Sequence, residues 1–149
     1  MSAPRRALLT GAALLAAFGP AACVSPAWDD HDYALKAGKT AEAAASAVQI
    51  ARTAVRHEDG TTRQYLKVVL TEAADDLGNV NDQFGGVQPP SDASERLRAE
   101  VTDLTEKAED EVHGLLDQVR RDRVRDPAAA VRDLGEIAGR LSAFAERHR

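Results

Sequence analysis

Apolar residues recur at alternating spacings of three and four along most of the chain after residue 30, the period of a helix with one buried face. In residues 30–57 this stripe consists of Ala34, Ala37, Ala41, Ala44, Val48, Ala51 and Val55. The heptad spacing and small side chains predict a helix that a neighbouring helix approaches closely. We expect this helix to end near His57, with Gly60 as its C′ residue.

A second helix is predicted to start at Thr61 as N-cap, with Gln64 completing a capping box. Its stripe consists of Leu66, Val69, Ala73, Leu77, Val80 and Phe84. Gly78 lies within this pattern, and glycine costs about 1 kcal/mol relative to alanine in a helix interior. The helix is therefore expected either to kink at Gly78 or to end there. The Gly- and Pro-rich residues 85–90 form a clear break.

The third predicted helix opens at Ser91 or Asp92 and ends within residues 122–125. It has the most regular stripe in the chain, formed by Leu97, Val101, Leu104, Ala108, Val112, Leu115 and Val119. Asp126 followed by Pro127 is an N-cap and N1 pair, which predicts the start of a fourth helix. The inner face of that helix consists of Val131, Leu134, Ala138, Leu141 and Ala145, widened by Ile137 and Phe144.

No stretch alternates with period two, so no sheet is expected. Four long helices with short connections predict an all-α fold, an antiparallel up-down-up-down four-helix bundle over residues 31–149. The alternative is a pair of helical hairpins that completes its core by dimerising, so a homodimer is one predicted assembly. Trp28 and Tyr33 lie at the start of the bundle, where they are expected to cover its end or to reach a lipid interface.

The amino-terminal residues have the layout of a secretory signal. Arg5 and Arg6 precede an apolar segment over residues 7–18, and small residues lead to Cys23. A spanning helix needs about 20 apolar residues, whereas this run is rich in Ala and Gly and contains Pro20. We therefore expect a cleaved signal peptide over residues 1–22.

The residues Ala21-Ala22-Cys23 resemble the end of a lipobox in bacterial lipoproteins, and the Ala- and Arg-rich composition is similar to that of actinobacterial proteins. The resemblance implies cleavage before Cys23 and diacylglycerol on its sulfur, although Pro20 stands where an apolar residue is usual. Arg5-Arg6 also resembles a twin-arginine signal. Residues 23–30 then form a lipidated tether, and the expected location is the outer face of the cell membrane.

Cysteine count and charge exclude several classes of protein. Cys23 is the sole cysteine, so no internal disulfide and no site with several thiolates exists. Loss of Arg5 and Arg6 changes the formal net charge from −5 to −7, which counts against nucleic-acid binding. Phosphate loops, nucleophile elbows and zinc-protease motifs are absent from the sequence. We expect a protein that is not an enzyme and has no cofactor.

Three groups of charged residues are candidate sites. Arg120, Arg121, Arg123 and Arg125 form a basic run that suits the carboxyl end of a helix or binds an anionic polymer or acidic partner. The run Asp29-Asp30-His31-Asp32 suits a helix start better than a metal. Glu109, His113 and Asp117 share one helix face, and Asp110 with His113 loosely resembles the Glu-x-x-His element of di-iron bundles. A solvated acidic face is the preferred interpretation, with no metal site.

These observations favour a membrane-tethered lipoprotein that acts as an extracytoplasmic interaction or scaffold module, with an unknown envelope protein or polymer as partner. The alternative is a bundle that carries a small ligand or a metal in its interior. Exposed apolar residues on two adjacent faces favour the first hypothesis. Polar residues at core positions favour the second.

Overall fold

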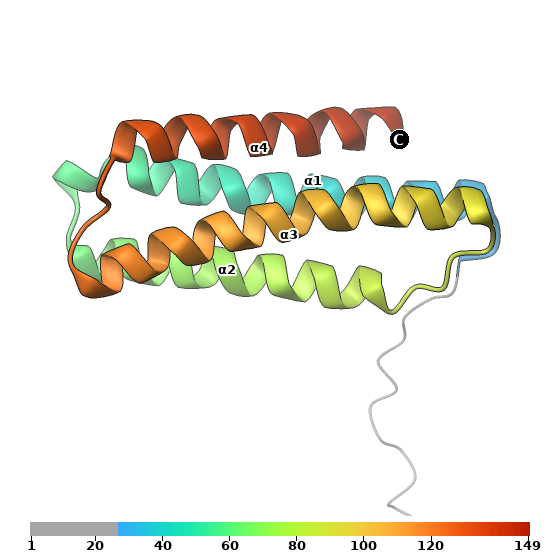
Figure 1. Cartoon of the computed structure of the whole chain (residues 1–149), viewed down its shortest axis with the longest axis horizontal. Coiled ribbons are helices and arrows are strands. Elements are labelled where there is room, and N and C mark those ends of the chain that lie inside the picture. Colours follow the sequence, from blue (N-terminus) through green and yellow to red (C-terminus); the bar gives the residue numbers. More distant parts are fainter. Residues whose placement is uncertain (1–26) are drawn as a thin grey trace, which may run out of the picture.

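The computed structural model describes residues 27–149. The predicted signal peptide, Cys23 and residues 23–26 of the predicted tether lie outside the described residues. The described part holds four α-helices, α1 (Asp30–Arg56), α2 (Arg63–Gly85), α3 (Asp92–Arg121) and α4 (Pro127–Arg147), with the 3-10 turn η1 (Glu58–Gly60) after α1. No residue from 27 to 149 lies in a strand. The all-α class and the four helices are confirmed (Figure 1).

Polar side chains cap the start of each helix. The Asp29, Ser91 and Asp126 side chains accept hydrogen bonds from backbone N–H groups at the starts of α1, α3 and α4, and Pro127 stands in the first turn of α4 as predicted. These caps satisfy donors that the first turn of a helix leaves without intrahelical partners.

Two predicted boundary details were wrong. The cap of α2 is Thr62 and not Thr61, because the Thr62 hydroxyl accepts from the Tyr65 N–H at 3.2 Å. Gly60 does not adopt a left-handed C′ conformation, since no residue of the described part has a positive φ. The chain instead tightens into η1 after His57. α2 also continues through Gly78 without a break.

Contacts between helices establish how they run. The Tyr33 ring at the start of α1 packs 5.3 Å from the Phe84 ring at the end of α2. Gly38, also near the start of α1, meets the main chain of His148 at the end of α4. α1 is therefore antiparallel to both neighbours. Figure 1 shows the α1–α2 and α3–α4 connections at one end of the bundle and the α2–α3 connection at the other.

Small residues on α1 allow it to pack against each of the other three helices. Its buried seam contains the predicted Ala37, Ala41, Ala44, Val48, Ala51 and Val55. Apart from Tyr33 of α1, the largest core side chains come from the other helices and include Leu70, Leu77, Leu116, Leu134, Leu141 and Phe144. Burying each of these contributes about 1.5–3 kcal/mol, so the bundle core dominates the stability of the fold.

Arg52 of α1 is hydrogen-bonded to α4. Its Nε donates to the main-chain oxygen of Val131 at 3.0 Å. A Cβ on Gly135 would lie 3.0 Å from the Arg52 guanidinium carbon, so the glycine leaves room for that group. This contact fixes the register of α4 on α1.

The two aromatic residues at the start of the bundle have different environments. Tyr33 is completely buried against Phe84 and covers the end of the core. Trp28 is 85% exposed and does not cover the bundle. The prediction that these two residues cover the end of the bundle is thus correct for Tyr33 alone.

Candidate interaction surface

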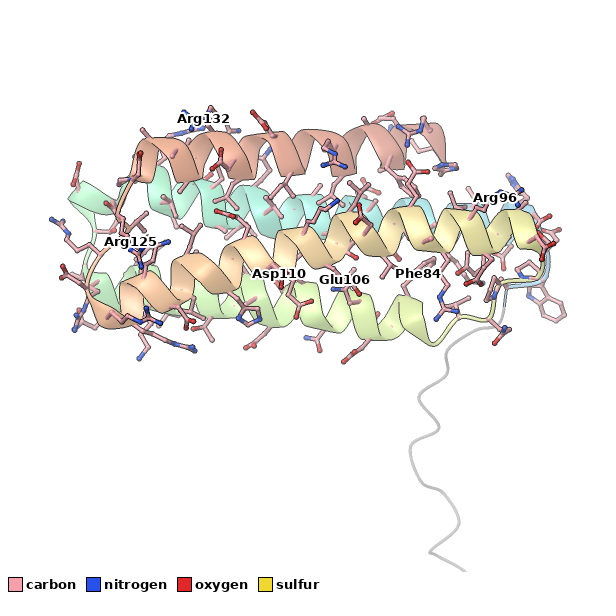
Figure 2. All side chains as sticks on the ribbon, viewed as in Figure 1. Phe84, Arg96, Glu106, Asp110, Arg125 and Arg132 are labelled. Atoms are coloured by element: carbon pink, nitrogen blue, oxygen red, sulfur yellow. The ribbon has the colours of Figure 1, made fainter. Side chains whose placement is uncertain are left out.

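The four arginines of the basic run lie at the end of α3 and in the connection to α4. All four are exposed, and Figure 2 shows Arg125 in that connection. Arg120 lies 3.4 Å from Asp117, and Arg123 lies 3.9 Å from Asp59. Sequence reasoning missed Asp59, which the bundle brings to this end from the α1–α2 connection. Val124, which lies between Arg123 and Arg125 in the sequence, is buried.

A small pocket of about 100 Å³ lies beside the basic run, between η1, the start of α2 and the end of α3. Glu58 and Asp122 line it together with Arg63 and Arg123, so charges of both signs face it. Burial raises the pKa of Glu58, and the Asp59 charge acts in the same direction, while Arg123 opposes them. Such a mixed lining lacks the uniform positive potential that an anion site requires.

The carboxylates at the start of α1 turn to different partners. Asp29 accepts from the Asp32 N–H at 2.8 Å, and Asp32 accepts from the Lys36 ammonium at 2.6 Å. Asp30 accepts from the hydroxyls of Ser91 and Ser94 at 2.5 and 2.6 Å. These two hydroxyl bonds hold the pKa of Asp30 below its ordinary value. The group serves to cap α1 and to join it to α3.

The candidate carboxylates of α3 either contact neighbouring side chains or are exposed to solvent. Glu109 accepts from the Asn81 amide of α2 at 2.6 Å and lies 3.7 Å from the His113 ring. Figure 2 shows Glu106 and Asp110 on α3, and both are exposed. No group of three His, Cys, Asp or Glu side chains suited to a metal occurs among residues 27–149.

One surface that sequence reasoning missed carries large apolar side chains in solvent. Ile50 of α1 is 54% exposed, and Tyr65 and Val68 of α2 are 55% and 54% exposed. We call these three residues, with the groove that Ile50 and Tyr65 line, the α1–α2 face. The signal was present in the sequence, because all three lie outside the predicted apolar stripes of their helices.

The groove of the α1–α2 face has a volume of about 550 Å³ and a mainly apolar lining. Its lining residues are Gln49, Ile50, Thr53, Ala54, His57, Thr61, Tyr65, Val69 and Glu72. A second groove, between α1 and α4, begins on the other side of Ile50 and shares Gln49 with the first. Ile50 is thus a ridge between two grooves, a shape that suits docking against another helix.

The interior of the bundle offers few polar atoms to a ligand. Ser94 and Thr105 are the buried polar residues of the described part. The Ser94 hydroxyl donates to Asp30, and the Thr105 hydroxyl donates to main-chain oxygens at 3.1 Å. The Tyr33 hydroxyl is buried without a hydrogen-bond partner among residues 27–149, and burial raises its pKa. One isolated hydroxyl does not make a polar ligand site.

Within residues 27–149, no helix combines the length and hydropathy needed to cross a bilayer. Comparisons of the chain with protein-family models, curated proteins and solved structures give no match.

Proposed function

We propose that this chain is a non-enzymatic lipoprotein, tethered through Cys23 to the outer face of the cell membrane. Its bundle binds another component of the envelope through the α1–α2 face. The observation that carries the proposal is the exposure of Ile50, Tyr65 and Val68 on two adjacent helices. Large apolar side chains grouped on a surface are typical of protein–protein contact sites.

The direction of the tether supports this arrangement. Residue 27 leads into the start of α1, at the end of the bundle that holds the α2–α3 connection and the carboxyl terminus (Figure 1). A lipid on Cys23 then keeps this end near the membrane. Tyr65 and Val68 follow the start of α2 at the opposite end, so the α1–α2 face is presented to the envelope.

The alternative of a small-ligand or metal carrier has less support. The core seams are apolar, and the hydroxyls of Ser94 and Thr105 are already hydrogen-bonded. The basic run is a secondary candidate for partner contact, because Arg121 and Arg125 are exposed. Its mixture with Asp59 and Asp122 makes it a weaker surface than the α1–α2 face.

Site-directed photo-crosslinking in native membranes tests the proposal. A photoreactive residue replaces Ile50 in the intact lipoprotein, and a matched variant carries it at Glu106, an exposed position on α3. We expect crosslinked products from position 50 and none above background from position 106. Equal yields at both positions, or none at position 50, would contradict a binding role for the α1–α2 face.

A further inference from the structure

The charges on the exposed side of α1 are complementary to those of a second α1 helix that runs in the opposite direction. Glu42, Gln49 and Arg56 are spaced seven residues apart, which puts them on nearly the same face of a helix, and all three are exposed. The acidic and basic residues are equidistant from Gln49, at about 10.5 Å along the helix.

The exposed residues of α1 between these two charges are uncharged, whereas the half-buried Arg52 donates to the Gln49 side chain at 3.4 Å. The exposed residues of α1 between Glu42 and Arg56 are Ala43, Ser46, Gln49, Ile50 and Thr53. A neutral centre with charges at its rim is the composition of a specific protein interface.

The two rim charges have no partner within their own bundle. No ion pair of the described part includes the side chain of Glu42 or of Arg56. By contrast, Arg52 has partners in its own bundle, because it donates to the main-chain oxygen of Val131 and to the side-chain oxygen of Gln49. Glu42 and Arg56 are therefore available to a second molecule.

We propose that the α1–α2 face binds a second copy of this chain, with the two α1 helices antiparallel and Gln49 at the two-fold axis. This inference rests on the proposed binding role of the face and not on the upright orientation of the bundle, because an antiparallel pair places the two tethered ends at opposite ends of the dimer. In this dimer Glu42 of each copy faces Arg56 of the other, giving two equivalent ion pairs. A parallel arrangement would place like charges together, which is unfavourable.

The apolar residues of α2 lie at the level where this arrangement needs them. α1 and α2 are antiparallel, and Tyr33 packs against Phe84. Counting inward from that pair brings Val68 level with Gln49. Ile50 and Tyr65, which line the same groove as Gln49, then lie beside the axis in both copies, while Val68 lies outside that groove. Ile50 and Tyr65 form the apolar centre that the two pairs of charges enclose.

Sedimentation velocity on the protein purified from membranes, in density-matched detergent, tests the dimer over a range of concentrations. We expect a monomer–dimer equilibrium that Ile50→Asp abolishes. Glu42→Arg alone and Arg56→Glu alone each weaken dimerisation by about tenfold or more, because each places like charges together. The double variant Glu42→Arg/Arg56→Glu restores dimerisation to within about threefold of the natural chain, because the reversed pairs form again.

Glu136→Arg and Arg140→Glu on α4 are the matched controls, since both positions are exposed and neither belongs to α1. They leave the dimerisation constant unchanged, and circular dichroism establishes that every variant is folded. A monomer at all concentrations, or no recovery in the double variant, overturns the inference. A monomer whose position 50 crosslinks to a different protein overturns the dimer and leaves the proposed function standing. No crosslink at position 50 removes both.

Discussion

A Cβ atom on Gly38 of α1 would overlap the main-chain carbonyl of His148 at the end of α4. A side chain at position 38 would push the two backbones apart. The clash is with a main-chain atom, so no change of side-chain rotamer can relieve it. Gly38 is therefore required for the last turn of α4 to pack on α1.

Gly38→Ala is expected to lower the free energy of unfolding by about 1–3 kcal/mol through overpacking. Gly139→Ala on α4 is the matched control, because a Cβ there meets nothing within 4 Å. That control stabilises by about 0.5–1 kcal/mol through its helix propensity. Chemical denaturation of the two variants measures the difference, and equal effects would refute the close approach.

Ser94→Ala removes the hydroxyl that donates to Asp30 and links α3 to α1. Because Ser94 is buried, we expect a loss of about 1–2 kcal/mol in the free energy of unfolding. Ser142→Ala changes an exposed serine on α4 and is expected to have little effect. Similar values for the two variants in urea denaturation would show that the Asp30–Ser94 bond contributes nothing.

The same bond predicts a dependence of stability on pH. The Ser91 and Ser94 hydroxyls lower the pKa of Asp30 below its ordinary value of 3.8. The ionised carboxylate thus stabilises the fold above this value, and the contribution is lost as the pH falls through the lowered pKa. We expect Asp30→Asn to reduce the loss of stability below about pH 4. An unchanged pH profile would remove Asp30 as a contributor.

Tyr33→Phe is expected to keep or raise the stability, by up to about 1 kcal/mol, because it removes a buried hydroxyl without a partner. The packing of the ring against Phe84 is retained. Tyr65→Phe removes a hydroxyl from an exposed ring and is the control. A clear destabilisation by Tyr33→Phe would show that its hydroxyl has a bound partner.

Glu111→Gln is expected to stabilise the protein at neutral pH by up to about 1 kcal/mol. Burial raises the pKa of Glu111, and the Asp133 charge adds to the shift. The charged form is therefore unfavourable in the fold, and stability falls as the pH rises through the raised pKa. The benefit of the variant shrinks below the ordinary pKa of 4.5. The exposed Glu106→Gln is the control, and equal effects at neutral pH would contradict the assignment.

The helices were predictable because their apolar period is written in the sequence. The stripe of α3 continues without interruption through Val119, and Asp126 with Pro127 marks the next start. The prediction placed the cap of α2 at Thr61, whereas the structure uses Thr62, because the two threonines have the same chemistry and only geometry selects one. The prediction also placed a left-handed Gly60 after α1, where the structure has the short η1 turn.

Contacts between helices were beyond sequence reasoning because periodicity identifies a face and not its neighbour. The bonds of Arg52 with Val131 and of Asn81 with Glu109 depend on register, which emerges only from packing. The α1–α2 face was overlooked because its apolar residues lie outside the periodic stripes. Ile50 does not belong to the buried stripe, and an apolar residue outside a stripe draws attention only once its exposure is known.

The mass of the protein isolated from its native membrane tests the central claim most directly. Intact mass spectrometry is expected to show a chain that begins at Cys23 and carries acyl chains. A product that retains Met1, or whose Cys23 sulfur carries no lipid, would contradict the tether and the orientation derived from it.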